Sequence, residues 1–366
     1  EAALQHVIIE SPHDYNQPMR EAMYGFMTQH LAGSGDGSPI AEPPIILEEP
    51  ETLRCYPGEA RPDDWLTLPG FAAQEAKRLA DQRKFPQTVA ALKAAAPGLR
   101  QELDRVLGGT AVRNVATAAP ATDTATEVQI TPEPGITLTM QMPAAEARSA
   151  ADWTFIVTTE ELTASATRNL HTALNKSPEQ TVRLQLRATG TDGWAEDRIG
   201  RAPDHNSAEW SLWVGRPLLG QWVRDVRSAI TALEQHGLDP SDRLHLAGSG
   251  AAAVAVLCAA ALDSRIDTVT AHGVPTSWAT DRPYEQQRLA MLPPAILRDV
   301  GDVEHIVALI APRPVQILAP TNGQGQALSP EFLSRSFAAA RIISSDAERT
   351  RVDGKAQVEQ ILRVAP

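Results

Sequence analysis

Chemistry in this sequence would centre on the stretch RLHLAGSGAAAVAVLCAAALD, in which a strand pattern runs into a helical pattern through small residues. A sharp turn of that kind can raise one side chain above the end of the strand, and a serine there can attack an acyl carbonyl. Two neighbours compete for this position, Ser249 and Gly250. Gly250 has no side chain and cannot attack a carbonyl. Ser249 is either the nucleophile or a small polar residue that eases a tight turn, and we favour the second interpretation.

A histidine that could serve such a serine closes the next strand pattern along the chain. His272 ends the stretch IDTVTAHG, whose apolar residues are typical of a buried strand. A neutral imidazole can take a proton from a hydroxyl group, so His272 is a candidate general base. A histidine at this position can equally line a pocket wall or pack in the core, and we favour that role.

Tryptophans gather in the stretch that precedes the turn. They are Trp194, Trp210, Trp213 and Trp222. An indole ring can stack on the apolar face of a sugar, so the first three are candidate carbohydrate contacts. Core packing beneath loops is the alternative, and we expect it to be the main role of the group.

One acidic cluster in the same stretch could suggest a metal. Asp204, His205 and Glu209 lie close together in RAPDHNSAEW, but no other residues supply the spacing of a specific site. A solvated loop explains the cluster better. We therefore expect no metal ion, and nothing in the sequence indicates a cofactor.

Strand and helix patterns alternate from about residue 126 onward, and the first of them, EVQITPEPGITLTMQMP, predicts a β-hairpin. This alternation predicts an α/β fold with a mostly parallel sheet and helices on both faces. Helical patterns at residues 71–107 come first, and Pro97 should break the second of them. The expected segments are a strand–histidine–helix unit at 1–35, a linker with helices at 36–125 and the α/β domain at 126–366.

The composition excludes several classes of function. The chain has 45 acidic and 33 basic residues, and its net charge is -12. Nucleic acid is disfavoured because phosphate binding needs clustered Lys and Arg. No apolar run reaches the roughly 18 residues that a membrane-spanning helix needs. Cys55 and Cys258 form no disulfide framework, so the cellular compartment stays open.

Five stretches together carry a family resemblance. They are the glycine turn, SLWVGRPLLGQWVRDVRSAITAL before it, DSRIDTVTAHG after it, LPPAILRDVGDVEHIVALIAPRPVQILAP, and HDYNQPMREAMYGF near the start. The chain resembles the acetyl xylan esterase-like group of α/β-hydrolases over most of residues 126–366 and the first ~35 residues. The resemblance implies the α/β-hydrolase fold, ester cleavage on acylated carbohydrate, and secretion or a periplasmic location.

The same resemblance implies that the catalytic positions are empty. Alignment on the helix that ends in AALD places the nucleophile position at Gly250. The family's acid follows the strand in APRPVQIL, where this chain has Asn322, and its histidine follows the last strand, where this chain has Ala347. The oxyanion hole would use the backbone N–H of Ala251 and one from the segment around Thr159.

The opening stretch HVIIESPHDYN is similar to ARIISSDAERT near the end, and this comparison places His13 over Ala347. The unit therefore resembles the end of an upstream copy of the same domain, and His13 would be the catalytic histidine of that copy. A turn or helix-capping histidine is the alternative. The expected partners are this upstream hydrolase domain and acylated polysaccharide.

Three functional hypotheses follow. The first is a non-catalytic hydrolase-like module of a tandem esterase that supports its neighbour or binds carbohydrate. The second is an active carboxylic ester hydrolase that uses Ser249 with His13 or His272. The third is a scaffold that acts only through contact with the upstream domain.

Overall fold

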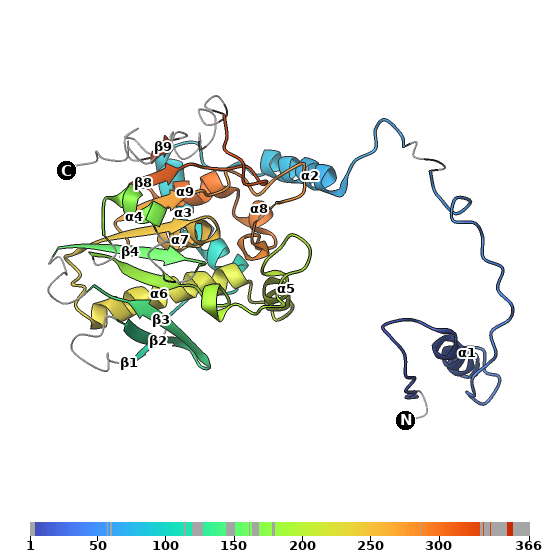
Figure 1. Ribbon diagram of the computed structural model, residues 1–366. Helices are drawn as coiled ribbons and strands as arrows, with labels where there is room; N and C mark the ends of the chain where they lie inside the picture. The colour runs from blue at the N-terminus through green and yellow to red at the C-terminus, as the bar shows by residue number, and fades with distance from the viewer. Residues whose placement is uncertain are drawn as a thin grey trace. The chain divides into compact units, whose positions relative to one another are not determined.

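The computed structural model divides the chain into two compact units, Glu1–Trp65 and Leu66–Pro366 (Figure 1). The structure describes residues 4–56, 58, 61–112, 115–118, 127–143, 151–160, 162, 168–177, 180–285, 287–329, 332, 337 and 350–353. The division differs from the expected boundaries after residues 35 and 125. The reason is that the helices expected in a linker pack against helices of the α/β domain and so belong to the second unit.

The first unit is organised around one helix, α1 (Gln17–Leu31), which begins after the N-cap residue Asn16. Arg20 donates two hydrogen bonds to the carboxylate of Glu42, at 2.8 and 2.6 Å. These bonds lower the pKa of Glu42 to about 2. The strand that opens the expected strand–histidine–helix unit is not observed, because the described residues of this unit include no second strand with which it could pair.

The second unit is built on one sheet, which has nine strands in its described residues, in the order β1-β2-β3-β5-β4-β6-β7-β8-β9. The strands are β1 (Ala116–Ala118), β2 (Glu127–Glu133), β3 (Ile136–Gln141), β4 (Asp152–Thr158), β5 (Val182–Gln185), β6 (Arg243–Ser249), β7 (Thr268–His272), β8 (Val315–Leu318) and β9 (Thr350–Asp353). Strands β1, β2 and β3 are antiparallel, as is the β3–β5 pair, and all pairs from β5 to β9 are parallel. The predicted β2–β3 hairpin and the predicted α/β class are confirmed.

Helices cover this sheet, and one of them lies at the centre of the core (Figure 1). The helices are α2 (Leu68–Gln82), α3 (Val89–Val106), α4 (Arg168–Leu174), α5 (His205–Trp213), α6 (Leu218–Gln235), α7 (Ala251–Leu262), α8 (Ile296–Asp299) and α9 (Val303–Ile310). Helix α7, AAAVAVLCAAAL, contacts α3, α6, α9 and several strands, so it is buried on all sides. A helix in that position has no polar face, which explains its sequence. Among the described residues, no helix has the length and apolarity needed to cross a membrane.

Pro97 does not break its helix, contrary to expectation. It lies inside α3, where a proline removes one backbone hydrogen bond. Tertiary contacts outweigh this loss. Leu92 and Leu103 of α3 are buried, and Arg100 donates to the backbone carbonyl oxygens of Ala261 and Leu309.

The strand order places a crevice at the end of β4. The chain runs from β4 to β5 on one side and then returns to β6 on the other, so β4 lies between them. In open parallel sheets, such a reversal leaves a crevice at the carboxyl ends of the strands, where ligands bind. The ends of β4 and β6 are therefore the positions at which a site is expected.

A buried ion cluster holds the strands and helix beside this crevice. Arg187 follows β5, and its Nε lies 3.0 and 2.9 Å from the carboxylate oxygens of Asp225 on α6. Its guanidinium also bonds to Glu133, which ends β2. Asp225 is fully buried, so the two charges depend on each other for solvation. The cluster joins the hairpin, β5 and α6.

Candidate active site

The bend between β6 and α7 has Gly250 at its apex. Its backbone angles are φ 57° and ψ -124°, a conformation that residues with a side chain adopt only with strain. A Cβ built on Gly250 would meet no atom within 4 Å. The position therefore has the strained geometry from which a nucleophile projects in enzymes with this bend, and it points into open space. It carries no side chain to project.

The first glycine of the turn is required by packing. A Cβ on Gly248 would lie 2.8 Å from the backbone oxygen of Ala252 and 2.9 Å from Cγ2 of Val256. Both neighbours belong to α7, so only glycine lets the strand and the helix approach this closely. The small residues of GSGAA thus serve the bend itself, with or without chemistry above it.

Ser249 is paired with His272. The two residues are register partners in the parallel β6–β7 pair, and Oγ of Ser249 lies 3.1 Å from Nδ1 of His272. Partial burial lowers the pKa of His272, which favours the neutral imidazole. The structure therefore brings together the two residues that the sequence offered as a candidate nucleophile and a candidate base, although we favoured other roles for both.

The backbone donors around this pair do not suit attack by Ser249. In acyl transfer, the oxyanion is bound by the N–H of the residue that follows the nucleophile. For Ser249 that donor is the N–H of Gly250, which already donates to the carbonyl oxygen of His272 at 2.8 Å. The N–H of Ala251, the first residue of α7, has no acceptor within the helix. This donor is therefore placed to serve residue 250.

The other expected oxyanion donor lies beside this bend. The segment around Thr159 follows β4, which pairs with β6 through Val157 and Gly248. The side-chain oxygen of Thr158 accepts the N–H of Glu160 at 3.0 Å, which fixes the turn. The guanidinium of Arg288 donates to the carbonyl oxygen of Thr159 at 3.3 Å. The strand ends thus bring Thr159 and Ala251 to the same edge of the sheet.

The expected acid position is used for a turn. Oδ1 of Asn322 accepts the backbone N–H of Gln324 and of Gln326, at 3.0 and 2.9 Å. Its Nδ2 donates to Oε1 of Gln326 at 3.0 Å. These hydrogen bonds run to Gln324 and Gln326, so the side chain of Asn322 stabilises its own loop. Ala347, the expected histidine position, lies outside the described residues.

His13 belongs to the first unit, where it is exposed. It precedes α1, but the helix is capped by Asn16, so a capping role for His13 is not observed. A role for His13 in another domain stays a prediction.

The tryptophans divide into one core residue and three exposed ones. Trp222 is fully buried, and its Nε1 donates to the carbonyl oxygen of Arg187 at 2.9 Å. Trp194, Trp210 and Trp213 are 48%, 45% and 73% exposed. The expected core packing is therefore wrong for these three tryptophans. They lie on α5 and on the loop before it, which are at the surface, and the buried residue of α5 is the small Ala208. The ring centroids of Trp194 and Trp210 are 5.5 Å apart, with their planes at 35°.

Asp204 holds two loops together. It is fully buried, and its carboxylate accepts the backbone N–H of Leu289 at 2.7 Å and of Ala290 at 3.1 Å. On α5, Nδ1 of His205 lies 3.7 Å from Oε2 of Glu209. Among the described residues, no three His, Cys, Asp or Glu side chains are grouped closely enough to hold a metal ion. Asp204 therefore fixes a loop, and the expected solvated loop is wrong for this residue.

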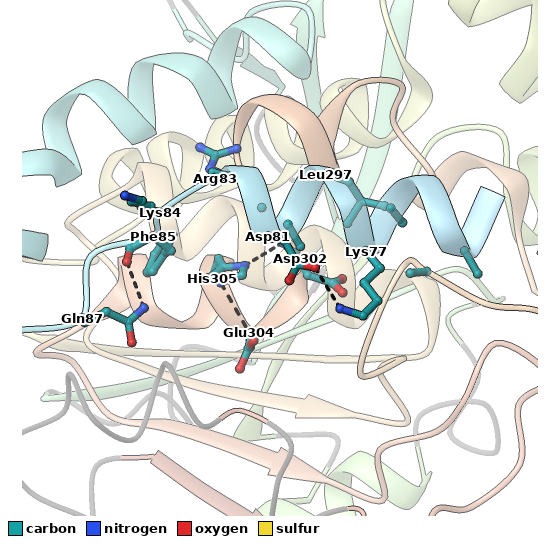
Figure 2. Close-up of a pocket in the computed structure, with 15 residues that line it drawn as sticks. Lys77, Asp81, Arg83, Lys84, Phe85, Gln87, Leu297, Asp302, Glu304 and His305 are labelled. Carbon is teal, nitrogen blue, oxygen red and sulfur yellow. Dashed lines mark hydrogen bonds and ion pairs between the residues drawn. The ribbon is translucent and has the colours of Figure 1, made fainter. Parts of the chain in front are cut away.

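A cavity of about 530 Å³, which no sequence feature indicated, lies between α2 and the start of α9 (Figure 2). His305 lines it, with its ring centroid 4.1 Å from that of Phe85 and its Nδ1 accepting the N–H of Asp302 at 2.8 Å. Burial lowers the pKa of His305 to about 4, so the ring is neutral at pH 7. The DVEH sequence signals the helix cap, but the alanine face of α2 resembles ordinary helix surface, so the cavity left no sequence signal.

Comparison with known proteins rests on structure alone. No protein-family model matches the sequence, and no curated protein matches it. A Bacteroides fragilis protein proposed to be an acetyl xylan esterase has a similar structure, with a TM-score of 0.58 over 80% of this chain and 84% of that chain, at 13% identity. The second unit has an α/β-hydrolase fold. The structure of methylesterase BT1017 is also similar to this α/β-hydrolase fold. The TM-score is 0.50, and the match covers 78% of this chain and 62% of the methylesterase chain, at 12% identity.

Proposed function

We propose that the second unit is a catalytically inactive α/β-hydrolase-fold module. The observation that carries the proposal is the bare Gly250 at a strained bend, with open space where a side chain would project. Covalent catalysis needs a nucleophile at that point, and glycine supplies none. The use of Asn322 in its own turn supports the same conclusion.

The module's role, in this proposal, is to bind acylated polysaccharide without cleaving it. The three exposed tryptophans support this role because indole faces stack on sugar rings. Trp194 and Trp210 form a pair, and their segment follows β5, whose carboxyl end lies at the same edge of the sheet as the bend. The partner would be an upstream hydrolase domain, with His13 as its catalytic histidine. A scaffold without a ligand would instead leave the exposed tryptophans without a function.

A second candidate function is ester hydrolysis by Ser249 with His272 as the base. The 3.1 Å contact between their side chains favours it, because nucleophile and base must lie within hydrogen-bond reach. One feature counts against it: the N–H of Gly250, which would have to bind the oxyanion, already donates to the carbonyl oxygen of His272.

The two functions are separated by measuring hydrolysis of p-nitrophenyl acetate and of acetylated xylan by the purified chain. The proposal predicts that the wild type hydrolyses these esters no faster than a control protein that has only ordinary surface serines. It also predicts equal rates for the wild type and Ser249→Ala. A rate lost in both Ser249→Ala and His272→Gln, with folding unchanged, would establish the esterase instead.

Carbohydrate binding is tested by fluorescence titration with acetylated xylo-oligosaccharides. Quenching should be saturable in the wild type and weakened in Trp210→Ala. Unchanged fluorescence at millimolar oligosaccharide would leave the scaffold role as the better account of the module.

A further inference from the structure

The described residues of the first unit form no hydrophobic core. The buried residues of its described part are two glycines, Gly25 and Gly37. Its exposed large apolar residues are Leu4, Val7, Ile8, Tyr15, Met27, Leu31, Ile40, Ile45, Ile46, Leu47, Leu53, Tyr56 and Trp65. Buried apolar surface must offset the conformational entropy of ordering a chain, and this unit buries almost none. The unit therefore needs another surface to cover its apolar residues.

The most open of these residues are consecutive. Ile45, Ile46 and Leu47 are 57%, 94% and 86% exposed and lie outside every helix and strand. Within the first unit, no hydrogen bond joins their backbone groups to another described residue. Prolines 43, 44 and 50 bracket the segment. Branched apolar side chains with free backbone donors and acceptors are what an added strand presents to a sheet edge.

The charge of the unit restricts what can cover this segment. Residues 1–65 contain twelve acidic and three basic residues, so they carry nine of the chain's twelve net negative charges. Glu48, Glu49 and Glu51 directly follow the apolar residues. A second copy of the unit would repel it, and residues 66–366, with 33 acidic and 30 basic residues, offer no opposite charge overall. The complementary surface is basic.

We propose that residues 43–51 are a docking strand, which pairs with the open sheet edge of a separate protein whose edge is bordered by Lys and Arg. In the paired strand, Ile45 and Leu47 face one side and Ile46 the other, because side chains alternate along a strand. The apolar residues fill pockets on the edge, and the glutamates meet the basic border. This inference is independent of the function proposed for the second unit.

The test begins with a photo-crosslinking amino acid in place of Ile46, in the full chain and in the cells that make it. The crosslinked protein is identified, the contact site is mapped, and binding of the purified partner is measured with the wild-type chain. Ile46→Asp is compared with Leu53→Asp, which adds the same charge at another exposed apolar residue of the unit. Hydrogen exchange follows the amides of residues 45–48.

We expect the crosslink to map to an edge strand flanked by basic residues, and the amides of residues 45–48 to become protected in the complex. Ile46→Asp should weaken binding at least about tenfold and Leu53→Asp less than about twofold. Added salt and Glu48→Gln should both weaken it. No crosslink, a crosslink only within the chain or to a second copy, unprotected amides, or binding that is indifferent to salt would each overturn the proposal.

Discussion

Replacement of Gly250 by alanine tests whether the bend is strained as the structure indicates. The residue has φ 57° and ψ -124°, and an added Cβ would meet no atom within 4 Å. The cost is therefore backbone strain alone, without a clash, and strain in such regions is of order 1–3 kcal/mol. We expect Gly250→Ala to lower the free energy of unfolding by that amount, in urea unfolding followed by circular dichroism.

Gly98 is the matched control. It lies inside α3 without a positive φ, and a Cβ there would also meet no atom within 4 Å. Gly98→Ala should raise the free energy of unfolding by about 0.5–1 kcal/mol, because glycine weakens a helix interior. If Gly250→Ala were as stable as the wild type while Gly98→Ala behaved as expected, the strained bend would be refuted.

Three further predictions concern burial and charge. Trp222→Ala should cost about 3–5 kcal/mol of unfolding free energy, and Trp213→Ala less than about 0.5 kcal/mol, in the same urea assay; equal effects would contradict the division of the tryptophans into core and surface. Burial lowers the pKa of His245 to about 4, so the unfolded chain takes up its proton first as pH falls below about 6.5. Stability should therefore decrease from pH 6.5 to pH 4, and His245→Gln should flatten this dependence in urea unfolding at several pH values. Arg187→Ala should cost about 3–5 kcal/mol because it leaves the buried carboxylate of Asp225 uncompensated, and a loss below about 1 kcal/mol would show that the cluster is not buried as described.

The fold class could be predicted from the sequence because its signals are local. Alternating strand and helix patterns, the hairpin around Pro-Gly and the wholly apolar helix after the glycine turn each reflect a nearby environment. Pro97 shows where local signals fail. Its position predicts a helix break, but contacts of Arg100 with distant carbonyl groups keep the helix intact.

The site could be predicted only in part. The small residues of the turn locate Gly250 because a close strand–helix approach restricts residue type. The contact between Ser249 and His272 depends on the register of β6 against β7, which a single sequence does not specify. The exposure of Trp194 and Trp210 likewise depends on where the loop before α6 lies, so the sequence left sugar stacking and core packing open.

The hydroxyl of Ser249 is the group on which inactivity most directly depends. A fluorophosphonate labels a serine only when a base and an oxyanion hole activate it. Intact-mass and peptide mass spectrometry of the full chain after long exposure to excess reagent, with an active serine esterase as the positive control, should show no label on Ser249. Stoichiometric labelling of Ser249 that disappears in His272→Gln would contradict the account of an inactive module.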